Sequence, residues 1–243
     1  MVGMKRYRKR CLYVYVLVIS LFVGVAAVMD RTVTALAETI PVYRSHTVVI
    51  DPGHGGEDGG AASCTGVLES EINLDISLRL RNLLHFMGYE TKMIRQTDTS
   101  VYTQGKTISE KKVSDLKERV RMVNETANAL LVSIHQNQFP EGKYSGAQVF
   151  YAPTEGSNAL ATQLQEQLVQ CLNPGSRRTS KPAEGVYLMK HIRCTGVLVE
   201  CGFLSNPEEE RLLRTPEYQK KLCCVLATTL ASYLESNSSD AVS

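Results

Sequence analysis

Two histidines and a glutamate each follow a hydrophobic run of the chain. His54 stands shortly after the run TVVI, His135 directly after LLVSI, and Glu200 directly after GVLV. In open α/β sheets, ligand sites gather outside the carboxyl ends of the strands. If the three runs are strands of one sheet, their imidazole and carboxylate groups meet at one edge. The spacing therefore predicts a single site built from metal ligands or proton carriers.

Zinc is the metal that these residue types favour. Two imidazoles and one carboxylate leave the fourth position of a catalytic zinc site to water. His54 and His135 supply the imidazoles, but composition alone does not choose the carboxylate. The candidates near His54 are Glu57, Asp58, Glu69 and Glu71. Glu69 has the advantage of lying at the N-terminal edge of a predicted helix, beside the Gly-rich loop.

The elements that must position these residues alternate along the chain. Short β-branched runs predict strands at 47–50, 89–95, 130–134, 147–151, 186–189 and 196–199. Periodic or capped segments predict helices at about 70–87, 114–127, 157–171 and 216–234, and the polar residues 96–113 predict a loop. Alternating strands and helices indicate a single-domain α/β fold, with a mostly parallel or mixed central sheet and helices on both faces.

The N-terminus carries an export signal. Five basic residues precede the charge-free apolar run 11–29, and the tripeptide 35–37 (ALA) offers a cleavage site. The run is also long enough to span a bilayer. Residues 1–37 are therefore expected to be a cleaved signal peptide or a retained membrane anchor. Either arrangement places the body of the protein outside the cytoplasm.

The remaining chain is expected to form a linker (38–46), one catalytic domain (47–235) and a flexible Ser- and Asn-rich tail (236–243). The formal charge of +2 comes from the N-terminus, since the residues after position 37 hold 21 basic against 24 acidic side chains. A mildly acidic body excludes the electrostatic footprint of a nucleic-acid-binding protein. Contact with a membrane is expected only through the N-terminal segment.

Four blocks of the sequence resemble the zinc-dependent N-acetylmuramoyl-L-alanine amidases and stand in that family's order. The blocks are VIDPGHGG at 49–56, ESEINL at 69–74, SIHQN at 133–137 and VECGFLSNP at 199–207. The resemblance spans roughly the whole predicted domain. It implies zinc ligands at His54, Glu69 and His135 and a catalytic carboxylate at Glu200. The family's E-K-D block reads E-S-E here, so this chain departs from the family pattern at Ser70 and Glu71.

A narrower resemblance is to the germination-specific amidases of spore-forming bacteria. It is carried by GAQVFY at 146–151, KP at 181–182 and VYLMKH at 186–191. It implies action on the peptide-bearing glycan of the spore cortex, in the space between the membranes of the developing spore or at the cell wall. The product, peptide-free muramic acid, is the precursor of muramic-δ-lactam. The enzyme is then expected to be targeted to its substrate by the catalytic domain itself, by the membrane or by an accessory protein.

Two alternatives stay open. A cell-wall zinc peptidase would bring Glu57 to the metal through the spacing His54-x-x-Glu57, and a non-catalytic protein on an amidase scaffold would bind peptidoglycan without cutting it. Several further residues are expected to be structural or solvent-facing. They are Arg119 and Asn124 (helix packing), His85 and His191 (surface), Glu208 to Glu210 (a solvated helix start) and Cys201, which alternation turns away from Glu200.

Overall fold

The computed structural model describes residues 19–20, 24–25 and 46–239. The predicted signal or anchor and the linker lie almost entirely outside the described residues, and so does the end of the chain from position 240. Contacts divide the chain into the units Met1–Val42 and Tyr43–Ser243, and the fold below is that of the second unit. Among the described residues, no helix combines the length and the apolar composition needed to cross a membrane.

Six strands form one mixed sheet in the order β2-β1-β3-β6-β4-β5. The strands are β1 (Thr47–Pro52), β2 (Glu90–Met93), β3 (Ala129–Asn137), β4 (Gln148–Tyr151), β5 (Lys181–Pro182) and β6 (Thr195–Phe203). Neighbours are parallel from β2 through β6, whereas β4 is antiparallel to β6. The parallel neighbours β1, β3 and β6 therefore end at one edge of the sheet.

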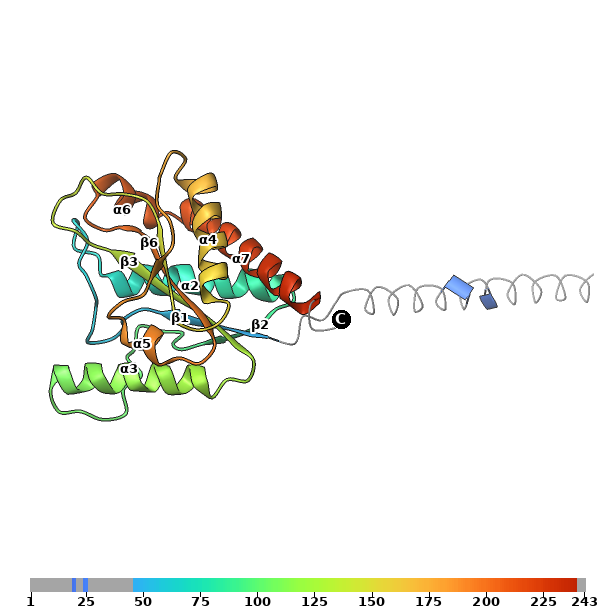
Figure 1. The fold of residues 1–243 in the computed structure, drawn as a ribbon, viewed down its shortest axis with the longest axis horizontal. Helices are drawn as coiled ribbons and strands as arrows, with labels where there is room; N and C mark the ends of the chain where they lie inside the picture. The colour runs from blue at the N-terminus through green and yellow to red at the C-terminus, as the bar shows by residue number, and fades with distance from the viewer. Residues whose placement is uncertain (1–18, 21–23, 26–45, 240–243) are drawn as a thin grey trace, which may run out of the picture. The chain divides into compact units, whose positions relative to one another are not determined.

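Helices cover both faces of this sheet, which confirms the predicted α/β class (Figure 1). One face packs on α2 (Glu69–Phe86), α4 (Ser157–Leu172) and α7 (Pro216–Ser239), and the other on α3 (Ile108–Asn124) and α5 (Tyr187–His191). A further helix, α6 (Pro207–Leu213), follows β6. Strand side chains alternate between two cores, because successive residues of a strand point to opposite faces. Ile50 and Val199 belong to the first core, and Val49 and Leu198 to the second.

Two expectations from the sequence were wrong. The segment 96–113 is not all loop, since α3 begins at Ile108, where Thr107 and Glu110 form a capping box. That box matches the pattern T-x-x-E, which outweighs the polar composition of the segment. Residues 186–189 form no strand, because Val186 is the N-cap of the short helix α5 and residues 187–189 belong to that helix. A four-residue apolar run has too little periodicity to separate the two conformations.

The last helix also runs further than expected. α7 continues to Ser239, past the predicted end near Leu234, and so includes the first residues of the segment predicted as a tail.

Candidate metal centre

The carboxyl ends of β1, β3 and β6 bring the predicted residues into one place. His54 lies two residues after the end of β1. His135 and Glu200 lie within β3 and β6, near the carboxyl ends of these strands. Both strands extend beyond their hydrophobic runs, and the two residues are direct partners in the strand register. By alternation they share the face that packs on α3, so Cys201 is turned into the opposite core and is fully buried.

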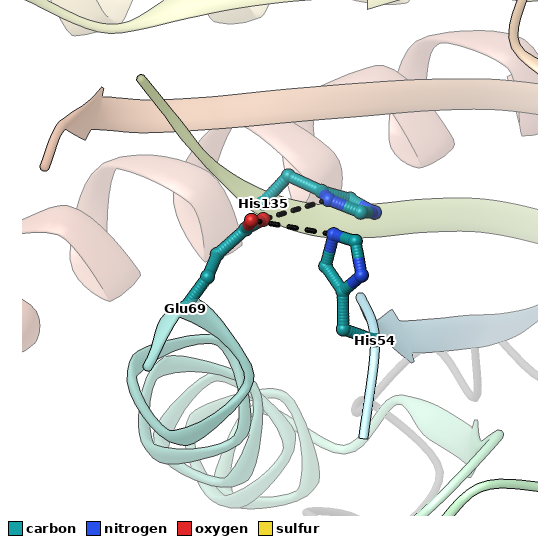
Figure 2. Close-up of side chains that lie close together, drawn as sticks. All are labelled: His54, Glu69 and His135. Atoms are coloured by element: carbon teal, nitrogen blue, oxygen red, sulfur yellow. Dashed lines mark hydrogen bonds and ion pairs between the residues drawn. The ribbon is translucent and has the colours of Figure 1, made fainter. Parts of the chain in front are cut away.

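His54, Glu69 and His135 form a cluster whose ligand atoms all lie within 4.8 Å of one another. Figure 2 shows the Glu69 carboxylate directed toward both imidazole rings, which lie next to each other. Oε2 of Glu69 lies 3.2 Å from Nε2 of His54, and Oε1 lies 2.9 Å from Nδ1 of His135. Two imidazoles and a carboxylate with this convergence form a set of groups that can hold a metal ion.

Glu69 is the first residue of α2 and is only 4% exposed. Its carboxylate also accepts hydrogen bonds from the backbone N–H groups of Ala61 and Gln136 and from Nδ2 of Asn73. Burial alone would raise the pKa of Glu69, but the hydrogen bonds from His135 and His54 outweigh it and lower that pKa strongly. The start of a helix also favours negative charge. Glu69 is thus held as an anion with both oxygens aimed at the histidines.

Glu200 lies beside this cluster without joining it. Its Oε2 atom is buried and has no hydrogen-bond partner among the described residues. Burial raises the pKa of Glu200 to about 7, and the nearby His135 and His54 only partly oppose this effect. Glu69 adds like-charge repulsion. A carboxyl group whose pKa lies near neutrality is suited to accept and return a proton.

His54, His135 and Glu200 line one cavity of about 460 Å³. The cavity lies on the α3 face of the sheet, where Ile108 and Leu116 supply apolar walls from α3. Apolar side chains of the segment 186–198 close another side, including Leu188 before β6. Pockets with apolar walls and a few convergent polar groups are typical of small-molecule and substrate sites.

Two buried arginines hold the turn that carries His54. Arg119 of α3 donates to the backbone oxygens of Pro52 and His54 and pairs with the buried Asp51. Arg95 donates to the oxygens of Pro52 and Gly53. His54 itself has a φ of 60°, a conformation that non-glycine residues adopt rarely and that the surrounding contacts must maintain.

Close packing explains a glycine in this turn. A Cβ atom on Gly53 would lie 2.3 Å from the ring of His135, so any other residue would displace that imidazole. The Gly-rich segment thus allows the β1 turn to approach β3 closely.

The other acidic candidates have different partners. Glu57 forms an ion pair with Lys111 at 2.7 Å, and its side chain is 52% exposed. Glu71 is exposed on α2. Asp58 contacts His54, but at Nδ1, the ring nitrogen that does not face Glu69. Of the four candidate carboxylates, Glu69 is therefore the one that the fold brings to both histidines.

The remaining predicted residues have structural or exposed positions. Arg119 is structural as expected, and Asn124 bridges the backbone of His191 and Arg193. His191 is exposed and its ring stacks on Tyr187. His85 is also exposed, on α2.

The acidic run at the start of α6 was interpreted wrongly. Glu209 and Glu210 are 5% and 2% exposed rather than solvated. Glu209 accepts the backbone N–H groups of Gly146 and Phe203, and Glu210 accepts the hydroxyl groups of Ser63 and Thr65. No local pattern in the sequence separates these buried carboxylates from Glu208.

A mixed α/β sheet with a His–Glu–His cluster and an adjacent buried carboxyl group is an arrangement that metal-dependent hydrolases use. The chain matches the Amidase_3 family of N-acetylmuramoyl-L-alanine amidases over residues 48–232, and it belongs to that family of hydrolases.

Similar proteins agree with this assignment. The germination-specific N-acetylmuramoyl-L-alanine amidase of Bacillus subtilis (strain 168) is 38% identical over 188 residues, which are 76% of this chain and 78% of that protein. The CwlD amidase from Clostridioides difficile, solved in complex with the GerS lipoprotein, superimposes with a TM-score of 0.75 at 36% identity, covering 78% of this chain and 98% of that one. An N-acetylmuramoyl-L-alanine amidase from Clostridium difficile 630 gives a TM-score of 0.69 at 30% identity, and the match covers 79% of this chain and 98% of that one.

Proposed function

We propose that this protein is a zinc-dependent amidase that hydrolyses the bond between N-acetylmuramic acid and L-alanine in peptidoglycan of the spore cortex. The observation that carries the proposal is the convergence of His54, Glu69 and His135 beside Glu200 in one cavity. Membership of the amidase family supports the bond that is cut.

The geometry of the three residues fits zinc. Bonds of roughly 2.0–2.1 Å to nitrogen and oxygen place neighbouring ligands of a tetrahedral zinc ion about 3.3 Å apart. Oε2 of Glu69 lies 3.2 Å from His54 and Oε1 lies 2.9 Å from His135, and one ligand atom of each residue lies within 4.8 Å of the other two, which supports a shared metal ion. His54, Glu69 and His135 would hold the ion.

The remaining chemistry belongs to the chain. Bound zinc supplies a Lewis acid that acidifies the attacking water and polarises the scissile carbonyl. Glu200, which lines the cavity, accepts the proton of that water and returns it to the departing nitrogen of alanine.

The spore cortex is proposed as the substrate because of the narrower resemblance. The similar Bacillus subtilis protein is named a germination-specific amidase, and it matches this chain at 38% identity. The product is then peptide-free muramic acid, the precursor of muramic-δ-lactam. Residues 1–37 direct export, as a cleaved signal or an anchor, so that the enzyme acts outside the cytoplasm.

An accessory protein is part of the proposal. The similar CwlD amidase was solved together with a lipoprotein, GerS. A partner of this kind offers one route by which a catalytic domain reaches the cortex.

The peptidase alternative is disfavoured by the position of Glu57, which pairs with Lys111 rather than with the metal cluster. The non-catalytic alternative is disfavoured by Glu200, since a buried carboxyl group without a partner costs stability and is unexplained in a purely binding site.

Digestion of two substrates tests the proposal. The purified protein, loaded with zinc, is incubated with spore-cortex glycan that carries peptides and with vegetative peptidoglycan, and mass spectrometry identifies the products. We expect free peptides that begin with L-alanine, and faster release from cortex glycan. Equal rates would remove the cortex assignment alone, whereas cuts within the peptide would support the peptidase alternative. Intact substrate, even after addition of sporulating-cell extract, would support the non-catalytic one.

A further inference from the structure

Asp58 contacts the metal cluster without belonging to it. We propose that Asp58 is a positioning residue that fixes the tautomer and ring orientation of His54, so that Nε2 of His54 is presented to the metal. The inference rests on the metal centre proposed above and adds to it a carboxylate that does not bind the ion.

The two nitrogens of His54 have separate partners. Nδ1 lies 3.0 Å from Oδ2 of Asp58, and Nε2 lies 3.2 Å from Oε2 of Glu69. A carboxylate only accepts hydrogen bonds, so the contact with Asp58 keeps a hydrogen on Nδ1. A neutral imidazole with hydrogen on Nδ1 has its free electron pair on Nε2, the atom that faces Glu69 and His135. Asp58 thereby selects the nitrogen that can bind the ion.

Asp58 is itself held in place from α3. Its second oxygen, Oδ1, lies 3.0 Å from Nζ of Lys112 and accepts a long hydrogen bond of 3.4 Å from the backbone N–H of Gly60. One oxygen of Asp58 therefore contacts His54, and the other contacts Lys112 of α3 and the backbone of the loop. This division fixes the plane of the carboxylate, and through it the ring of His54. The helix α3 thus acts on the metal centre through a chain of three side chains.

The neighbouring residue provides a matched control. Glu57 lies in the same loop, and its Oε1 atom lies 2.7 Å from Nζ of Lys111. Lys111 precedes Lys112 on the same helix. Both pairs join the Gly-rich loop to α3. The Asp58 carboxylate reaches His54, whereas the Glu57 carboxylate is bound at both oxygens by Lys111. A role in holding the loop alone would give both residues the same effect.

Zinc affinity of the full chain separates the two roles. Competition with a chromophoric chelator is measured for the wild type and for D58A, D58N, K112M and E57A. Loss of a carboxylate that supports a metal-bound histidine lowers metal affinity by about 10–100-fold, which we expect for D58A. The zinc affinity of D58N should fall less than that of D58A, because the amide oxygen of Asn still accepts a hydrogen bond. K112M should lose at most about fivefold, since its ion pair is exposed, and E57A should stay within about twofold.

The result that overturns the inference is a D58A protein that binds zinc as tightly as E57A. Thermal unfolding of the metal-free variants checks that each is folded, and if D58A is not, the comparison of D58N with E57Q takes its place under the same criterion. In the zinc-loaded wild type, long-range proton–nitrogen NMR should find the ring hydrogen of His54 on Nδ1, and a hydrogen on Nε2 would also contradict the inference. A wild type that binds no zinc counts against the proposed function instead.

Discussion

At the scale of single residues, the turn that carries His54 rests on a buried ion pair. Asp51 of β1 is 1% exposed and Arg119 of α3 is 3% exposed. Asp51 also accepts the hydroxyl hydrogen of Ser133, so its carboxylate is fully engaged. Burial alone would raise the pKa of Asp51, but Arg119 and Ser133 outweigh it, and the pKa lies below its ordinary value.

Replacing Asp51 by Asn should therefore reduce stability in a pH-dependent way. Removing one partner of a buried pair costs about 3–5 kcal/mol, and D51N should be near the lower value because Asp115 still pairs with Arg119. A carboxyl group whose folded pKa is lowered stabilises the protein above its unfolded pKa of about 3.9, and this contribution is lost as the pH falls through the folded value. Urea unfolding at pH 7 and pH 3 should show the difference from wild type narrowing at low pH. D75N, at an exposed position of α2, is the control. If the stability difference between D51N and the wild type is the same at pH 3 as at pH 7, the prediction is wrong.

Glu200 is the second residue with a specific expectation. The variant E200Q keeps the size of the side chain but cannot carry a proton between water and nitrogen. Amidase turnover should fall by about 10²–10⁴-fold, the usual contribution of acid–base catalysis, while zinc content measured by atomic emission stays at the wild-type value. Near-normal turnover of E200Q removes Glu200 from the mechanism, and loss of zinc would make it a ligand.

At the scale of elements, α6 is attached to the sheet by a buried carboxylate. Glu209 accepts the N–H groups of Gly146 and Phe203, both at 2.8 Å. These backbone groups lie just before β4 and at the end of β6, so one side chain joins three elements. Truncating it leaves two buried N–H groups without their acceptor.

E209A should consequently lower the free energy of unfolding by about 1–3 kcal/mol or more, the cost of unsatisfied buried groups. E208A removes a charge from the same helix start at an exposed position and is expected to stay within about 0.5 kcal/mol. Denaturant unfolding of the two variants makes the comparison. Equal unfolding free energies for E209A and E208A would indicate that Glu209, like Glu208, is solvated and holds no buried backbone group.

The sequence predicted those elements whose pattern is local. α2 and β1 follow from periodicity and β-branched runs, and the edge of the sheet where His54, His135 and Glu200 meet follows from the parallel order of strands. Three features needed the folded chain. The choice of Glu69 over Glu57 depends on where α2 begins relative to β3. The burial of Glu209 depends on a loop 63 residues away in sequence. Arg95 carries no local sign that it supports the β1 turn.

At the scale of the whole molecule, the proposed ion joins elements that are far apart in the chain. His54 follows β1, Glu69 opens α2 and His135 lies in β3. A ligand that binds the folded state and not the unfolded one stabilises it by RT ln(1 + [L]/Kd), about 2.7 kcal/mol at a hundredfold excess over Kd. Zinc should therefore raise the unfolding temperature of the wild type in proportion to the logarithm of its concentration.

The same titration on H135A gives the control. Because one ligand is missing, zinc should shift the unfolding temperature of H135A far less than that of the wild type, and a chelator should reverse the wild-type shift. An equal shift for both proteins indicates that zinc binds elsewhere.

Bond-specific hydrolysis that depends on zinc would test the proposed function best. The protein is stripped of metal with a chelator, divided, and assayed on a defined muropeptide with and without added zinc, with H135A in parallel and mass spectrometry of the products. The proposed mechanism predicts free peptide beginning with L-alanine, together with peptide-free muramic acid, in the zinc-loaded wild type alone. Equal cleavage without metal, or a cut at any other bond, would contradict it.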